Sequence, residues 1–208
     1  MDSSDAAELI AELNEDRQEQ AEAERFRSGA ALMIAFLAAV LAIGGLGGGN
    51  ATDDMIDSNI RASDTWAFFQ AKNVRQTMYE LALADLEAEV AASGGPSEAQ
   101  AARLADYRAT IARYESEPDP EAPGDPLRGE GKRELRAQAE AFEAAREEAV
   151  ARDGNFDMAE VLLQLALVLG SVAILAVNRP ILLLSGLLGL AGAALTANGF
   201  LLIAPLPI

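Results

Sequence analysis

The sequence predicts an all-α integral membrane protein with three transmembrane helices. It also predicts an extramembrane antiparallel helical domain, coiled-coil-like, between the first and second spans. Long uncharged apolar segments lie near both ends of the chain, and the acidic stretch between them shows helical apolar repeats separated by Gly and Pro clusters. The alternative is a soluble protein that buries these segments. A chain of 208 residues cannot easily do so, because most surface helices must be amphipathic.

The composition excludes several classes of chemistry. The chain has 33 acidic and 16 basic residues, a formal net charge of −17, and neither Cys nor His. Disulfides, thiolate nucleophiles, Cys or His metal sites and Ser-His-Asp triads are therefore excluded. The negative charge argues against nucleic acid as a partner, because phosphate neutralisation needs clustered Lys and Arg. We expect no cofactor and no enzymatic activity.

The first predicted span is residues 29–49, which follow an acidic N-terminal helix or tail at 1–28. The segment carries no charge, and at about 1.5 Å per residue its length matches a hydrocarbon core of about 30 Å. A cleaved signal peptide is the alternative. The acidic leading region has the wrong sign of charge for one, so we interpret the segment as a retained anchor.

The second and third predicted spans are residues 159–177 and 181–204. Between them lie Asn178, Arg179 and Pro180. Proline lacks an N–H group and disfavours helix at the residue before it, so it suits the first turn of a new helix. The pattern therefore predicts a tight hairpin of two spans rather than one long bent helix.

Small and polar residues in these spans point to helix packing. Gln164 lies near the start of the second span and Asn198 near the end of the third, so an antiparallel hairpin would let their amides hydrogen-bond. The alternative is a polar path for an ion or proton, with Glu160 as its ionisable member. A stripe of small residues, which permits close helix contact, recurs every four positions in the third span: Ser185, Gly189, Ala193 and Ala197.

The middle of the chain, residues 50–157, is predicted to be the acidic helical domain. A helix over 64–92 ends at a Gly-Gly-Pro turn, and it begins earlier if the glycines ending the first span are its only break. Ser97 and Gln100 form a capping box that starts a second helix. A Pro-rich loop at 118–131 follows, and a third helix runs from about Lys132 to a predicted end at Asp153 and Gly154.

Thin apolar seams characterise these helices. In the first, Asp85 interrupts the stripe, and a shifted face takes over. The second carries a seam containing Leu104 and Tyr107. The shifted face of the first comprises Tyr79, Leu83, Leu86 and Val90. Such Ala-rich helices bury little area alone, so a homo-oligomer or a membrane-protein partner is one expectation and a monomeric three-helix bundle the other. The stripe on the first helix comprises Ala67, Ala71, Val74, Met78 and Leu81.

The densest mixture of aromatic and polar side chains lies early in the first of these helices. We interpret its members as candidates for contact with a partner, a neighbouring subunit or lipid headgroups. The alternative is core packing with a solvated polar edge. These candidates are Trp66, Phe69, Gln70, Lys72 and Asn73.

The stretch from Ser63 to Glu80, and its core Trp-Ala-Phe-Phe-Gln-Ala-Lys at 66–72, resembles the segment that marks an uncharacterised bacterial membrane protein family, domain of unknown function 4337. The resemblance covers nearly the whole chain. It implies the same topology: an acidic N-terminal helix, one span, a helical loop and two closing spans. It implies no activity and no catalytic residues.

These observations favour a membrane-anchored helical scaffold or protein-interaction module. The alternative is a subunit of a transporter or channel with a polar path near Glu160, Gln164 and Asn198. An enzyme with a carboxylate site, and a cation site at the acids of 53–57, are weaker alternatives. Basic residues at Arg25, Arg27 and Arg179 favour a multi-pass inner-membrane protein with a cytoplasmic N-terminus.

Overall fold

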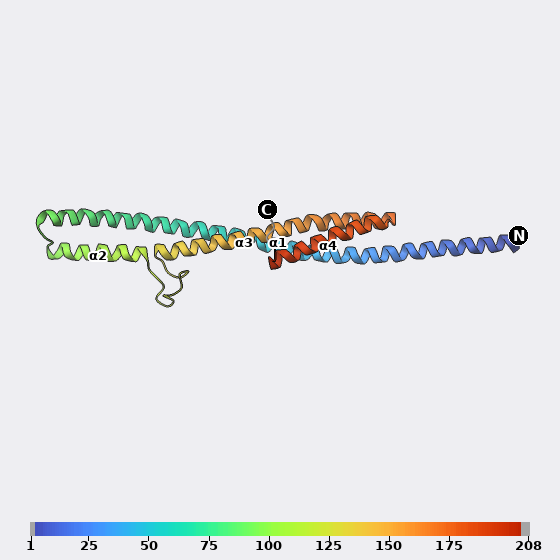
Figure 1. Ribbon diagram of the computed structural model, residues 1–208, viewed down its shortest axis with the longest axis horizontal. Helices are drawn as coiled ribbons and strands as arrows, with labels where there is room; N and C mark the ends of the chain where they lie inside the picture. Colours follow the sequence, from blue (N-terminus) through green and yellow to red (C-terminus); the bar gives the residue numbers. More distant parts are fainter. Residues whose placement is uncertain (1–2, 205–208) are drawn as a thin grey trace. The chain divides into compact units, whose positions relative to one another are not determined.

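The computed structural model describes residues 3–204 and shows four helices (Figure 1): α1 (Ser3–Ser93), α2 (Glu98–Glu115), α3 (Lys132–Ala176) and α4 (Arg179–Leu201). The described residues contain no β-strand, so the all-helical prediction is confirmed. The chain divides into two compact units. We call Met1–Thr52 with Val150–Ile208 the terminal unit, and Asp53–Ala149 the central unit.

Helices α1 and α3 each continue from one unit into the other. The glycines at 44–49 leave α1 helical, and the helix end predicted at Asp153 and Gly154 is wrong because α3 runs on to Ala176. Glycine inside a helix costs only about 1 kcal/mol relative to alanine. A Cβ added at Gly47 would lie 2.6 Å from the Phe156 ring, so the missing side chain permits α1 and α3 to pack closely here.

The terminal unit packs three apolar helical segments against one another. Its core cluster consists of Leu37 from α1 and Leu163 and Ala166 from α3, and Leu188 of α4 packs against this cluster. By length and composition, α1, α3 and α4 each contain a stretch that could cross a membrane. The three apolar segments predicted from the sequence therefore lie on three helices that meet in one unit.

The predicted small-residue stripe on α4 is buried over only part of its length. Ser185 and Gly189 are buried, but Ala193 is only half-buried and Ala197 is exposed. A four-residue step turns an α-helix by about 400°, so a strict four-residue repeat drifts about 40° per step around the helix. The face that is buried instead alternates steps of four and three: Ser185, Gly189, Gly192, Thr196 and Gly199.

The turn between α3 and α4 follows the prediction. Asn178 is the N-cap of α4, its side chain accepts a hydrogen bond from Ile181 N at 3.1 Å, and Pro180 lies in the first turn. The predicted amide pair differs. Asn198 Nδ2 donates to Asn155 Oδ1 at 2.7 Å, while Gln164 Nε2 donates to Glu160 Oε1 at 2.7 Å on an exposed surface. Gln164 faces outward, because a different face of α3, formed by Leu163 and Ala166, packs in the core of the terminal unit.

The central unit is two helices thick. Antiparallel α2 lies beside the last part of α1, with the rings of Tyr79 and Tyr107 5.6 Å apart. The start of α3 then lies beside an earlier part of α1, where Trp66 Nε1 donates to Glu143 Oε1 at 2.9 Å. Helices α2 and α3 therefore follow one another along α1 (Figure 1). The three helices are therefore not bundled at one level, which differs from the three-helix bundle expected for a monomer.

The turn between α1 and α2 is encoded locally. Gly94 and Gly95 have φ of 79° and 147°, which glycine adopts without the steric cost of a Cβ. The capping box predicted at Ser97 and Gln100 is confirmed, with the Ser97 side chain accepting from Gln100 N. This geometry turns the chain back along α1 and starts α2 at Glu98.

We predict that Gly189→Leu destabilises the terminal unit. A Cβ at Gly189 would lie 2.6 Å from Leu37 Cδ1, so a larger side chain separates α4 from α1. Overpacking of this kind costs about 1–3 kcal/mol and should lower the Tm of the detergent-solubilised protein. Ala197→Leu, on the exposed side of α4, is the matched control. Equal Tm values for the two variants would contradict this packing.

Candidate functional site

The aromatic part of the motif at 66–72 packs inside the central unit. The Trp66 and Phe69 rings meet edge to face with centroids 5.4 Å apart. The indole N–H of Trp66 is satisfied by the Glu143 carboxylate of α3. A half-buried Trp with a satisfied N–H holds α1 and α3 together at this level of the unit.

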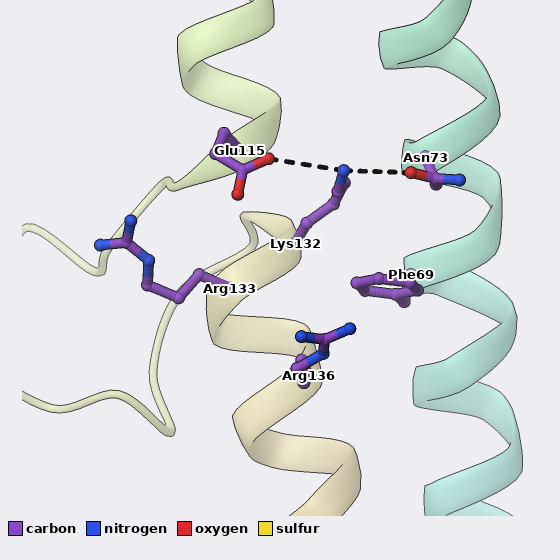
Figure 2. A pocket seen from close by; sticks show the side chains of 6 residues that line it. All are labelled: Phe69, Asn73, Glu115, Lys132, Arg133 and Arg136. Atoms are coloured by element: carbon purple, nitrogen blue, oxygen red, sulfur yellow. Dashed lines mark hydrogen bonds and ion pairs between the residues drawn. The ribbon is translucent and has the colours of Figure 1, made fainter.

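A hollow of about 450 Å³ lies beside Phe69 where α1, α2 and α3 meet. Lys132, the first residue of α3, donates to Asn73 Oδ1 at 3.0 Å and pairs with Glu115 Oε2 at 3.4 Å. Figure 2 shows Lys132 and Arg136 directed from α3 towards α1, and Arg133 directed to the other side. We call this hollow the basic pocket. Its lining consists of Phe69, Asn73, Glu115, Lys132, Arg133 and Arg136.

Positive charge dominates the basic pocket. Lys132 and Arg136 also lie over the Phe69 ring, at 5.9 and 5.7 Å from its centroid. The hydrogen bond from the Gln76 amide lowers the pKa of Glu115, burial opposes this, and the charge of Lys132 lowers the pKa further. Glu115 therefore stays ionised at neutral pH and balances one of the three cations.

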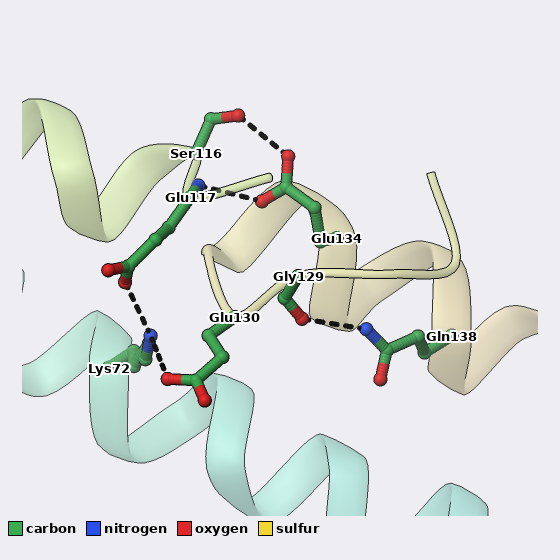
Figure 3. A network of polar contacts seen from close by, with 7 residues as sticks. All are labelled: Lys72, Ser116, Glu117, Gly129, Glu130, Glu134 and Gln138. Atoms are coloured by element: carbon green, nitrogen blue, oxygen red, sulfur yellow. Dashed lines mark hydrogen bonds and ion pairs between the residues drawn. The ribbon is translucent and has the colours of Figure 1, made fainter. Parts of the chain in front are cut away.

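Lys72 links α1 to both ends of the loop between α2 and α3 (Figure 3). Its side chain is 11% exposed, its Nζ lies 3.4 Å from Glu117 Oε2 and 3.9 Å from Glu130 Oε2, and it lies over the Tyr114 ring. A buried ammonium needs such partners, because desolvation without them is costly. Lys72 therefore ties the loop to α1.

Glu134 closes the neck of the same loop. This carboxylate of α3 is buried and accepts from Ser116 Oγ at 2.6 Å and from Glu117 N at 3.0 Å. Burial raises its pKa, but these two hydrogen bonds and the nearby charge of Arg133 together outweigh burial, so the pKa lies below the ordinary value. Gly131 cannot carry a Cβ without meeting Glu117 N and the Glu134 carboxylate.

The opposite side of α1 in the central unit is apolar and uncovered. The predicted stripe at 67–81 lies there, while Leu86, on the shifted face, is buried. Within the described part of the central unit, Leu127 is the one large exposed apolar residue that does not belong to α1. We use the name outer face for five residues that are 52–66% exposed: Ile60, Phe68, Val74, Met78 and Leu81.

The predicted contact candidates divide between two environments. Trp66, Phe69, Lys72 and Asn73 all contact side chains of α2, α3 or their connecting loop, whereas Gln70 is exposed. The partners of these side chains on α3 were not predicted from the sequence. A cluster of three basic residues at the start of a helix was the available signal, at Lys132, Arg133 and Arg136.

Among the described residues, no group of three or more carboxylate side chains is arranged to hold a metal ion. Asp57, in the acidic cluster that follows the first apolar segment, pairs instead with Arg61 at 2.8 Å.

A protein-family model matches most of this chain. The family described as "Domain of unknown function (DUF4337)" matches residues 26–202, which is most of the chain, so this chain belongs to that family. The comparisons with curated proteins and with solved structures found no match.

We predict that Glu134→Ala loosens the neck of the loop. It removes the acceptor of Ser116 Oγ and Glu117 N, and an unsatisfied buried donor costs about 1–3 kcal/mol. Hydrogen exchange of the full-length protein should then accelerate at the Glu117 amide. Glu140→Ala, at an exposed position of α3, should leave this exchange unchanged.

The protection of this amide should also depend on pH. The folded pKa of Glu134 lies below its ordinary value of 4.5, so its stabilising effect is complete above 4.5 and declines as the pH falls below it. Exchange corrected for its intrinsic rate should accelerate in acid in the unmodified protein. In Glu134→Ala the corrected rate should stay flat at this amide, and a parallel acid response in both proteins would contradict the role of Glu134.

Proposed function

We propose that this member of the DUF4337 family is a membrane-anchored helical scaffold without enzymatic activity. Its terminal unit anchors the chain in a cell membrane through α1, α3 and α4. Its central unit presents a helical surface for association with another protein. The observation that carries this proposal is the uncovered apolar outer face of α1.

The exposure of the apolar segments supports the membrane anchor. In α1, α3 and α4 only 17%, 28% and 22% of the most apolar stretch is buried within the chain. Water would make such exposure unfavourable at about 25 cal/mol per Å² of apolar surface, whereas lipid tails do not. Leu175 at 82% and Leu32 at 72% exposure are examples.

The basic residues beside the spans set the proposed orientation. Arg25 and Arg27 precede the apolar part of α1, and Arg179 lies at the turn into α4. With three spans these residues share one side of the membrane. The positive-inside rule places that side in the cytoplasm and the central unit on the other.

A second copy of the chain is the partner that best fits the outer face. Val74, Met78 and Leu81 of the outer face continue a repeat that begins at Ala67 and Ala71, in alternating steps of four and three, the spacing at which two parallel helices interdigitate. Copies inserted in one bilayer share their orientation, so their α1 helices would run parallel. Asp64 and Asp85 occupy the next positions of this repeat on either side, where like carboxylates would meet. The proposed seam therefore extends from 67 to 81.

The charges beside the seam are compatible with this pairing. Gln70 and Arg75 flank it on opposite sides, and both are exposed. In a parallel pair, flanking positions five residues apart face each other across the seam, so Gln70 of one copy meets Arg75 of the other. No acidic residue occupies the flanking positions between 67 and 82.

A transporter or channel subunit is the alternative function, but no arrangement of these residues favours it. Glu160 and Gln164 hydrogen-bond each other on an exposed surface, whereas Asn198 bonds to Asn155. The three predicted members of the polar path are therefore not brought together within one chain.

We predict that Met78→Cys forms a disulfide between two copies in native membranes. The chain has no Cys of its own, so the cross-link reports this position alone. Identical seam positions face each other in a parallel pair. Ala109→Cys, exposed on α2, is the matched control and should stay monomeric under the same mild oxidation. Equal cross-linking at both positions, or none at Met78, would contradict self-association through the outer face.

We also predict that the two ends of α1 lie on opposite sides of the membrane. A membrane-impermeant maleimide should label Ser97→Cys, in the turn after α1, without permeabilisation of the inner membrane. It should label Ser3→Cys only after permeabilisation. Labelling of both residues from one side would contradict the membrane-spanning assignment of α1, and the reverse pattern would contradict the proposed orientation.

A further inference from the structure

The basic pocket differs in charge from the unit around it. The central unit contains 21 acidic and 11 basic residues, yet the lining of the pocket contains three basic residues and one acidic residue. Lys132 and Glu115 pair with each other, and Arg133 is directed away from α1 with its charge acting on Glu134, which leaves the guanidinium group of Arg136 as the surplus positive charge facing α1. In the described part of the chain neither arginine forms an ion pair, whereas Lys72, Arg108 and Arg128 do.

The shape and lining of the pocket limit what could bind. A hollow of about 450 Å³ is larger than a single inorganic ion needs and suits a small organic molecule. Phe69 supplies an apolar wall, and Arg136 is directed over its ring (Figure 2). A guanidinium presents paired N–H donors that match the oxygens of a phosphate or carboxylate.

We propose that the basic pocket binds a small organic anion, of which a phosphate monoester with an apolar group is the simplest form. Arg136 holds the phosphate oxygens, and the apolar group lies against Phe69. Lys132 is already oriented by Asn73 and Glu115, so it contributes positive charge near the site without needing to move. This binding goes beyond the proposed scaffold function and does not require a second copy of the chain.

The fluorescence of Trp66 provides the readout of ligand binding to the pocket. Trp66 is the one tryptophan of the chain, and its ring meets that of Phe69 in the pocket wall. The full-length protein in phosphatidylcholine nanodiscs is titrated with phenyl phosphate while Trp66 emission is recorded. We expect a saturable change. The half-saturating concentration should rise at least tenfold in Arg136→Gln, rise to a lesser extent in Arg136→Lys, and stay unchanged in Arg108→Gln, whose partner is Glu87.

A second arm distinguishes a soluble ligand from a lipid headgroup. The same protein is placed in nanodiscs that contain phosphatidic acid, with no phenyl phosphate. A change of Trp66 emission there that Arg136→Gln abolishes would support the site and identify the phosphate as that of a lipid. A response to phenyl phosphate in phosphatidylcholine would support a soluble ligand. The absence of any response in both arms, or an equal response in Arg136→Gln with unchanged circular dichroism, would overturn the proposal.

Discussion

The one-sided coverage of α1 is the constraint on which the central unit depends. Helices α2 and α3 lie along the same side of α1, one after the other, so each level of the unit contains only two helices. Two helices bury one face each and leave the other faces open. The large apolar residues of the unit that stay exposed are accordingly concentrated on α1.

The apolar contacts along α1 are interrupted between the end of α2 and the start of α3, and polar contacts connect the segments there. Lys72, Lys132 and Glu134 each connect two or more segments there, and the basic pocket lies at the same level. Individual ion pairs of this kind are weak when exposed. Glu134 is buried, however, so removing it would leave Ser116 Oγ and Glu117 N without their acceptor.

Features encoded by neighbouring residues could be predicted from the sequence. The capping box at Ser97 and the start of α4 near Pro180 depend on a few adjacent residues. Features that depend on packing could not. The helix continues through Gly47 because the close packing of Phe156 there outweighs the small intrinsic cost of glycine, and the buried face of α4 drifts away from Ala197 because a four-residue step overshoots a full turn.

The candidate site illustrates the same division. The motif at 66–72 was recognisable as an unusual mixture of side chains, but its partners lie far away in sequence. Lys132 meets Asn73 across 59 positions, and Trp66 meets Glu143 across 77. Apolar repeats on α1 gave two stripes without indicating which one α2 and α3 would cover, because both have helical spacing.

Cysteine scanning of α1 tests the one-sided coverage most directly. The full-length protein is held as a single copy per lipid nanodisc, and the rate of maleimide labelling is measured at six positions in turn. The account predicts rapid labelling at Val74, Met78 and Leu81 and slow labelling at Tyr79, Leu83 and Leu86. Equal rates on the two faces, or protection of the first three positions in a single copy, would contradict it.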